Sequence, residues 1–333
     1  MTGRPVRIAV IGAGKIAEVG HIPGFIQAGA RVAALCDIHS QNLSRLAAAY
    51  QIDRTYTDWR DMLVDGEFDA VSVCTPPALH RDMVVASLEH GYATLVEKPM
   101  APTLDDCQAM IDAADRTGKM LMVAHNQRFR AQHVFARQTL ASGRLGQARR
   151  VHAVFAHGGP ENWSPTGGWY FDPKLAGYGV LLDLGYHKID LLRWLLGQEV
   201  IDARTFTATF EKPTTVDDTA VAILRFEQGT LATIAVSWAH HPDVPDSVTV
   251  SCEHGTLTVP SIPTEPVRVV EQRDTGEIVE TTFRPDPSAG PGWFEMARAF
   301  VRAVRNGEAS PLPGTEGKAS LETVLKLYAS AGL

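Results

Sequence analysis

The chain has 333 residues, of which 45% are hydrophobic and 21% are charged, and it contains no low-complexity tract. This length exceeds what one ordinary hydrophobic core needs, so it predicts two domains. The net charge of −7, with both signs interspersed, argues against nucleic acid or an anionic membrane as the main ligand. No apolar run approaches the roughly 18 residues that a membrane span requires.

The cysteines and the start of the chain bear on the compartment. The four cysteines lie far apart and form no CxxC pair, which predicts neither a zinc site nor a disulfide framework. The first predicted strand begins at Arg7, which leaves no room for a secretory signal peptide. We therefore expect a cytoplasmic protein.

The first third of the chain alternates apolar strands with segments of helical length. Helices are expected at 40–50, 79–90 and 103–119, with a further one after the first strand. Strands are expected at 6–12, 31–37, 69–76, 92–99 and 120–126. Strands that are apolar on both faces are typical of a parallel sheet covered by helices on each side. The sequence thus predicts an α/β, doubly wound domain over residues 1–124.

The turn after the first strand has the G-x-G-x-x-A form of a dinucleotide fingerprint, with Gly12, Gly14 and Ala17 at its fixed positions. The first glycine permits a tight turn, the second lets a pyrophosphate approach the backbone, and the alanine allows close packing of helix on strand. The pyrophosphate would lie at a helix N-terminus, where free N–H groups favour an anion. We predict a dinucleotide site here, with Lys15 and Ile16 beside the phosphates.

Asp37 ends the second predicted strand and bears on the choice of cofactor. A carboxylate in this place accepts hydrogen bonds from a ribose 2′-hydroxyl and repels a 2′-phosphate. The next residues, Ile38, His39 and Ser40, include no arginine that would bind such a phosphate. NAD is therefore favoured over NADP. The alternative is an ordinary turn acid after a strand.

Two further strand ends carry polar side chains toward the edge where ligands collect in this fold. One brings Thr75, Pro76 and His80, and the other brings Glu97 and Lys98. An ammonium group beside a dinucleotide can be offered to a reacting oxygen, although Glu97 and Lys98 could instead form a solvated loop ion pair. The predicted cofactor-binding residues are Gly12, Gly14, Lys15, Ile16, Asp37, Thr75, Pro76, His80, Glu97 and Lys98.

After His125 the alternation of strand and helix stops, and strands of alternating polarity follow. Helices are expected at 132–142, 179–196, 292–306 and 316–330. The strands are expected at 149–157, 200–210, 218–226, 230–239, 247–260, 267–271 and 278–283. Strands of this kind bury one face and leave the other for a partner subunit or for the first domain.

The mostly apolar segment 181–194 carries Asp183 and His187, four residues apart. In an α-helix these side chains point the same way. Two interpretations stay open at this point. His187 is either a core histidine held by a neighbouring carboxylate, or part of a pair that faces a cavity and transfers protons.

In order and spacing, these motifs resemble the Gfo/Idh/MocA oxidoreductases, the family of glucose–fructose oxidoreductase and inositol dehydrogenase. The resemblance covers the whole chain and is carried by the fingerprint, Asp37, the 75–80 turn, E-K-P at 97–99 and D-L-G-Y-H at 183–187. It implies an NAD-binding Rossmann domain followed by a substrate-binding and oligomerisation domain over 125–333. This second domain is expected to be α+β, with a large open, mainly antiparallel sheet that commonly forms dimers or tetramers.

Carried over by position, the resemblance makes Lys98, Asp183 and His187 the catalytic residues. It implies an NAD-dependent dehydrogenase that oxidises a secondary hydroxyl of a sugar, a cyclic polyol or a sugar derivative, or reduces the ketone. The Lys98 ammonium would stabilise the developing alkoxide, and neutral His187 would take the hydroxyl proton. Asp183 would position the substrate or the imidazole.

Other polar and aromatic residues are expected to shape the substrate pocket. Arg128 could bind a carboxylate or phosphate, or it could hold the domains together. Rings of the 158–179 loop, Trp163, Trp169 and Tyr170, could cover a sugar face or merely pack the loop. The predicted substrate-binding residues are Lys98, Asn126, Arg128, His157, Trp169, Asp183 and His187.

Three alternatives compete with a dehydrogenase. An NAD-dependent glycosidase would use a transient 3-keto intermediate without net redox, and a sensor would bind sugar and NAD without catalysis. A metal site at Asp183, His187 and His157 is disfavoured, because no compact ligand motif is present and Lys98 would repel a cation.

Overall fold

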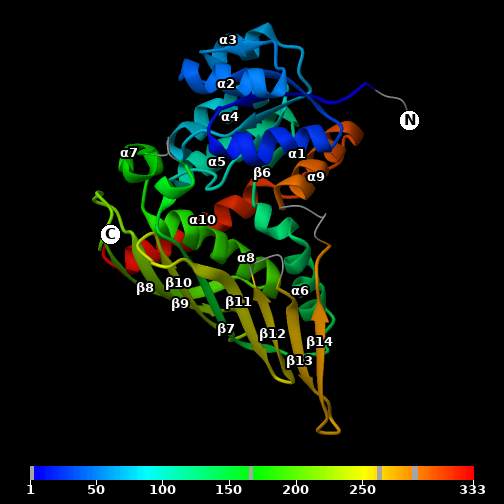
Figure 1. Ribbon diagram of the computed structural model, residues 1–333, viewed down its shortest axis with the longest axis vertical. Helices are drawn as coiled ribbons and strands as arrows, with labels where there is room; N and C mark the ends of the chain where they lie inside the picture. Colours follow the sequence, from blue (N-terminus) through cyan, green and yellow to red (C-terminus); the bar gives the residue numbers. More distant parts are fainter. Residues whose placement is uncertain (1–3, 165–167, 261–264, 287–291) are drawn as a thin grey trace.

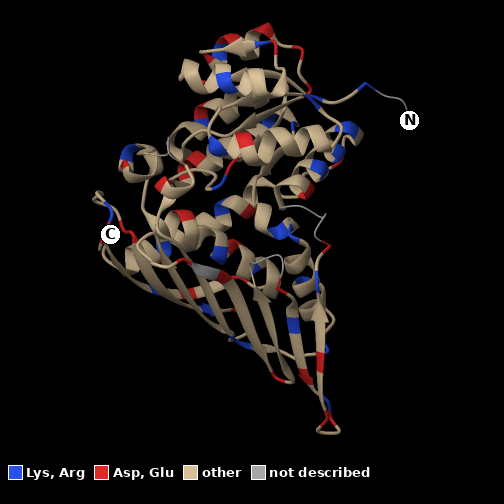
Figure 2. Cartoon of the chain, viewed as in Figure 1, with Lys and Arg blue, Asp and Glu red and all other residues tan. Residues whose placement is uncertain are grey.

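The computed structural model describes residues 4–164, 168–260, 265–286 and 292–333, and these residues form two sheets with helices around them (Figure 1). No described helix is long and apolar enough to cross a membrane. Charged residues of both signs are spread over both parts of the molecule (Figure 2).

The first sheet has six strands in the order β3-β2-β1-β4-β5-β6, and all its pairings are parallel. Its strands are β1 (Arg7–Ile11), β2 (Arg31–Cys36), β3 (Thr55–Tyr56), β4 (Ala70–Val73), β5 (Ala93–Val96) and β6 (Leu121–Val123). Side chains such as Ile8, Val10 and Val71 are fully buried, as expected for strands covered on both faces. The predicted doubly wound sheet is confirmed.

The helices of this part are α1 (Ile22–Gln27), α2 (Ser40–Tyr50), α3 (Trp59–Asp65), α4 (His80–Glu89) and α5 (Leu104–Thr117). A π-helical segment, Ala17–His21, precedes α1. Thr103 caps α5 by accepting the N–H of Asp106 at 3.1 Å. β3 and α3 were not predicted from the sequence, because a strand of two residues and a helix of seven show too little periodicity.

The second sheet has eight strands in the order β14-β13-β12-β11-β7-β10-β9-β8, and only the β7–β10 pairing is parallel. The strands are β7 (Ala148–Ala156), β8 (Val200–Ala208), β9 (Thr219–Phe226), β10 (Leu231–Ser237), β11 (Val244–Cys252), β12 (Gly255–Pro260), β13 (Val267–Gln272) and β14 (Ile278–Phe283). The mainly antiparallel sheet is confirmed. The single strand expected over 247–260 is wrong, since it is a hairpin that turns at Glu253 and His254.

One face of the second sheet is covered by α8 (Tyr186–Leu196) and α10 (Gly314–Ser330) (Figure 1). α10 also contacts α5 and β6, while α9 (Gly292–Asn306) packs against α1 of the first part. α6 (Ala131–Ala141) packs against α8, and the short α7 (Pro173–Ala176) lies in the loop after β7. The C-terminal helices therefore join the two parts, and the division at residues 124 and 125 stays a prediction.

Candidate active site

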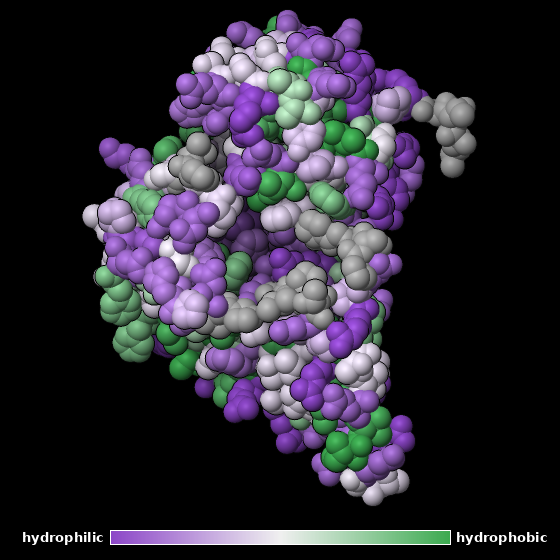
Figure 3. Space-filling model, in the orientation of Figure 1, coloured by the Kyte–Doolittle hydropathy of each residue, from purple (hydrophilic) through white to green (hydrophobic). Residues whose placement is uncertain are grey.

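A cavity of about 1080 Å³ lies where the carboxyl ends of the parallel strands meet the covered face of the second sheet. The molecular surface is hollowed between the two parts (Figure 3). We call this space the central cavity. Predicted site residues that line it are Gly12, Gly14, Lys15, Ile16, Asp37, Thr75, Pro76, Glu97, Lys98, Asn126, His157, Trp169, Asp183 and His187.

The fingerprint glycines meet the demands of a dinucleotide site. Gly12 has φ +99°, and a Cβ there would lie 2.7 Å from the carbonyl oxygen of Cys74. A Cβ on Gly14 would instead meet nothing within 4 Å, so the space beside it is open. The first glycine is required by the turn, and the second leaves the backbone accessible to a phosphate.

Asp37 is held in place at the end of β2. Its two carboxylate oxygens accept the backbone N–H groups of Ala13, at 2.6 Å, and His39, at 2.7 Å. The carboxylate lies beside the fingerprint turn and still lines the central cavity. A fixed negative charge in this position suits a ribose hydroxyl and opposes a phosphate.

Thr75 and Pro76 line the central cavity, but His80 does not. His80 is fully buried, with Nε2 2.7 Å from the carbonyl oxygen of Thr75 and Nδ1 3.1 Å from that of Met100. Burial is the main cause that lowers its pKa, so the ring is neutral at pH 7. The structure thus places His80 outside the cavity lining, where its ring links the residues after β4 to those after β5.

Glu97 lines the cavity, yet it is not part of a solvated loop ion pair. It is buried, and its oxygens bond to Nε2 of His21, at 2.7 Å, and to the backbone N–H of Lys98, at 2.9 Å. Burial alone would lower the pKa of His21, but Cys74 and Glu97 outweigh it and raise that pKa to about 10. Glu97 with His21 therefore anchors the end of β5, from which Lys98 extends.

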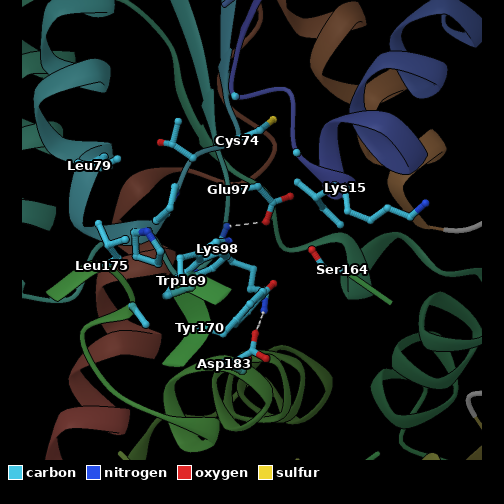
Figure 4. Close-up of a pocket in the computed structure, with 18 of the residues that line it drawn as sticks. Lys15, Cys74, Leu79, Glu97, Lys98, Ser164, Trp169, Tyr170, Leu175 and Asp183 are labelled. Atoms are coloured by element: carbon cyan, nitrogen blue, oxygen red, sulfur yellow. Dashed lines mark hydrogen bonds and ion pairs between the residues drawn. The ribbon is translucent and has the colours of Figure 1, made fainter. Parts of the chain in front are cut away.

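Lys98 reaches across the cavity to Asp183 (Figure 4). Its Nζ donates to Oδ1 of Asp183 at 2.6 Å and to the carbonyl oxygen of Asp183 at 3.3 Å. Both side chains are mostly buried, with 13% and 12% exposed. An ammonium has three donors, so one N–H of Lys98 remains for a ligand oxygen.

Trp238 also lines the cavity, although it is not among the predicted site residues. It is fully buried just after β10, and its Nε1–H donates to Oδ2 of Asp183 at 3.2 Å. Both oxygens of Asp183 are thus used, one by Lys98 and one by Trp238. Asp183 was expected to position the substrate or the imidazole of His187. Its carboxylate instead contacts Lys98 and Trp238, and no hydrogen bond joins it to His187 among the described residues.

His187 lies in the first turn of α8, and Asp183 lies in a π-helical segment, Leu181–Gly185, just before it. The imidazole lines the cavity and makes no hydrogen bond with any residue that the structure describes, and its Nδ1 is buried. Burial first, and then the positive charge of Lys98, lower the pKa of His187 well below 6.5. A neutral imidazole without a partner is able to accept a proton.

The predicted substrate residues divide into two groups. Asn126, His157 and Trp169 line the cavity, but Arg128 does not. Arg128 forms a bidentate pair with Asp190, at 2.6 and 2.9 Å, and donates to Glu316 at 2.8 Å. The structure therefore places Arg128 outside the candidate substrate site, because the side chain does not line the cavity and its Nε and Nη2 are occupied by internal acids. Its other predicted role, which is to hold parts of the fold together, agrees with this network.

Aromatic rings cover the cavity on the side of the 158–179 loop. Trp169 stacks on Tyr170, with ring centroids 3.8 Å apart, and Tyr170 also meets Trp238 edge to face. Burial, followed by the charge of Asp183, raises the pKa of Tyr170 well above 10, so its hydroxyl keeps its proton. In the part of the chain that the structure describes, no three His, Cys, Asp or Glu residues cluster as metal ligands.

The sequence matches known families over both parts. Residues 6–125 match the model of an oxidoreductase family with an NAD-binding Rossmann fold, and residues 133–258 match the GFO/IDH/MocA C-terminal domain. Inositol 2-dehydrogenase 2 of Saccharopolyspora erythraea is 31% identical over 236 residues, which span 69% of this chain and 66% of that enzyme. The 1,5-anhydro-D-fructose reductase of Ensifer adhaerens is 29% identical over 98% of this chain and 96% of that enzyme.

Solved structures share the fold over almost the whole chain. The WlbA dehydrogenase of Bordetella pertussis, in complex with NADH and UDP-GlcNAcA, has a TM-score of 0.84 at 26% identity, over 99% of this chain and 97% of that one. A levoglucosan dehydrogenase, in complex with NADH and levoglucosan, has a TM-score of 0.88 at 19% identity, over 99% of this chain and 98% of that one. At 19% identity, the similarity to levoglucosan dehydrogenase shows a shared fold only.

Proposed function

Because the chain belongs to the Gfo/Idh/MocA family of NAD-binding oxidoreductases, we propose that it oxidises a secondary hydroxyl of a sugar, polyol or sugar derivative with NAD. The observation that carries this proposal is the meeting of Lys98 and His187 in one cavity with the fingerprint turn. The relatives named above act on inositol and anhydro sugars, which supports a polyhydroxylated substrate.

In the proposed reaction, Lys98 and His187 act together to remove the hydroxyl proton. The free N–H of Lys98 donates to the substrate oxygen and stabilises the negative charge that develops there. His187, neutral at pH 7, accepts the proton as general base, and returns it in the reverse direction. NAD⁺, when bound at the fingerprint turn, would supply the hydride acceptor, and the protein supplies the orientation.

The proposal is tested by following NADH absorbance while the purified protein is offered NAD⁺ and a panel of aldoses, polyols and sugar acids. We expect at least one member of the panel to yield NADH in proportion to the amount of protein. Release of sugar from an aryl glycoside with no accumulation of NADH would favour the glycosidase alternative. Binding of NAD and sugar with no turnover of any substrate would favour a sensor.

The choice of cofactor is expected to depend on Asp37. The wild-type protein should bind NADH at least about tenfold more tightly than NADPH, because the carboxylate repels a 2′-phosphate. The double variant Asp37→Ser with Ile38→Arg should remove or reverse this preference, since Ile38 is exposed and lines the cavity. Dissociation constants from fluorescence titration test this, and equal wild-type affinities would contradict it.

We also propose that the chain forms a homodimer or homotetramer through the uncovered face of the second sheet. This face carries Phe206 on β8 and Val221 and Ile223 on β9, with 87%, 52% and 56% of their surface exposed. Phe206 lies directly opposite Val221 in the strand register. Apolar side chains that cluster in this way are typical of an interface between subunits.

Phe206→Asp is expected to reduce the molar mass of the assembly, because a carboxylate in the middle of an apolar interface would be buried without a partner. Light scattering after size-exclusion chromatography measures this effect. Ile278→Asp, at an exposed position on the distant strand β14, is the matched control and should leave the mass unchanged. A wild-type protein that is monomeric at micromolar concentration would rule out the proposed interface.

A further inference from the structure

Arg130 places a positive charge in the central cavity that the proposed reaction does not use. The residue lines the cavity at the start of α6. Its buried Nη1 atom has no hydrogen-bond partner among the residues that the structure describes. The nearest acid is Asp246, whose Oδ2 lies 3.8 Å from Nη1, which is too far for a hydrogen bond.

Asp246 is already occupied by another cation. Lys188 is fully buried, and its Nζ contacts Oδ1 of Asp246 directly. One carboxylate therefore faces two positive side chains, and the closer one is Lys188. In this cluster of Arg130, Lys188 and Asp246, two basic side chains share one carboxylate, and Arg130 is the member that lines the cavity.

The other lysines that line the cavity are paired with acids. Lys98 is paired with Asp183 at 2.6 Å and Lys15 with Glu18 at 3.4 Å. Among the acids, Glu97 is paired with His21, and Asp172 caps α7 by accepting the N–H of Lys174. Among the lining cations that the structure describes, Arg130 is thus the least balanced.

A guanidinium nitrogen that is buried without a hydrogen bond is costly, and burial lowers the pKa of Arg130 even though the guanidinium stays charged. The cost is recovered when an anion binds, because the guanidinium can donate two parallel hydrogen bonds to a carboxylate or phosphate. Gln127, also on the cavity wall, has a buried Oε1 that accepts no hydrogen bond from any described residue, and this oxygen could accept a substrate hydroxyl beside that anion.

Arg130 also lies near the proposed base. Its positive charge, with those of Lys98 and Lys188, contributes to the low pKa of His187. An anion bound at Arg130 would offset this charge. It would therefore make His187 a stronger base when the substrate is in place.

We infer that the substrate carries a carboxylate or phosphate group, and that the guanidinium of Arg130 binds this group while Lys98 and His187 act on the hydroxyl. This inference rests on the proposed function. It narrows the substrate to acidic sugars or sugar phosphates.

The test compares matched pairs that differ in charge: D-glucuronate and D-glucose, D-galacturonate and D-galactose, and D-glucose 6-phosphate and D-glucose. Isothermal titration into the NAD⁺-loaded protein gives affinities, and NADH formation gives kcat/KM. The variants are Arg130→Met and the charge-conserving Arg130→Lys. Arg137→Met is the matched control, because Arg137 lies on the same helix and donates to the carbonyl oxygen of Leu195 at 2.9 Å.

We expect the wild-type protein to bind at least one anion about 10- to 100-fold more tightly than its neutral partner. Arg130→Met should lose this preference, Arg130→Lys should keep part of it, and Arg137→Met should keep all of it. Unchanged affinity for NAD⁺ shows that the variants are folded. The carboxylate and phosphate pairs identify which anion is preferred.

A wild-type protein that favours no anion, or a preference that survives in Arg130→Met, would overturn the inference. Oxidation of neutral sugars alone would overturn it while leaving the proposed dehydrogenase intact. If no compound yields NADH, the proposed function fails, and the titrations with anions then decide the role of Arg130 by themselves.

Discussion

Lys98→Ala is expected to lower kcat/KM for sugar oxidation by about 10²- to 10³-fold, the range found when one preorganised donor to a developing oxyanion is removed. The structure leaves one N–H of Lys98 free for the substrate oxygen, and Asp183 with Trp238 fixes the direction of the side chain. The loss should be mainly in kcat, because the interaction strengthens as negative charge develops.

Lys98→Met is the matched variant, since it fills nearly the same volume without the charge and should lose as much activity as alanine. The dissociation constant of NAD⁺, measured by fluorescence, should change much less than kcat in both. If kcat/KM falls by less than about threefold in both variants while NAD⁺ still binds, Lys98 does not take part in the reaction.

His187→Asn is expected to lower kcat by about 10²- to 10⁴-fold, the usual contribution of a general acid or base. Asparagine is similar in size and cannot take up a proton at these pH values. Since the ring makes no hydrogen bond with the described residues, the substitution should change the thermal stability little. A large loss of activity with a nearly constant melting temperature would therefore be evidence of catalysis.

The pH profile gives His187 a signature of its own. Its folded pKa is depressed, so the imidazole is neutral at pH 7 and becomes protonated only when the pH falls well below 6.5. In the wild type, kcat/KM for oxidation should stay constant from pH 7 down to about 6.5 and fall in more acidic solution. This acid limb should be absent in His187→Asn. An acid limb centred above pH 7, or one that persists in the variant, would contradict the assignment.

Much of the fold could be predicted from the sequence because its signals are local. The apolar runs around Ile8 and Val71 repeat with helices between them, and a parallel sheet follows from that alternation. The later strands alternate in polarity, which predicts a sheet with one uncovered face. The exposed side chain of Phe206 lies on this face. The hairpin at Glu253 and His254 was missed, because the apolar alternation continues across its tight turn.

The candidate site was only partly predictable, because partners distant in sequence decide what a polar residue does. Arg128 follows a strand end and is close to other site residues, yet it binds Asp190 and Glu316, 62 and 188 positions away. Arg130, two residues further, is the arginine that faces the cavity. Nothing in the local sequence distinguishes these two side chains.

The relation between Asp183 and His187 shows a second limit. A spacing of four predicts one shared face of an α-helix, but Asp183 lies in a π-helical segment, where hydrogen bonds span five residues and the turn is wider. Both residues reach the cavity, but Asp183 contacts Lys98 and Trp238 instead of His187. Such local departures from α-helical geometry are frequent at functional sites.

The most direct measurement is a crystal structure of the Lys98→Ala variant in complex with NAD⁺ and a sugar that this variant binds but oxidises slowly. We expect the carbon to be oxidised to lie over C4 of the nicotinamide. When the wild-type protein is superposed on this complex, Nζ of its Lys98 and a ring nitrogen of His187 should both lie about 2.6–3.2 Å from the hydroxyl oxygen. A hydroxyl that contacts neither group, or a nicotinamide bound away from the central cavity, would contradict the account.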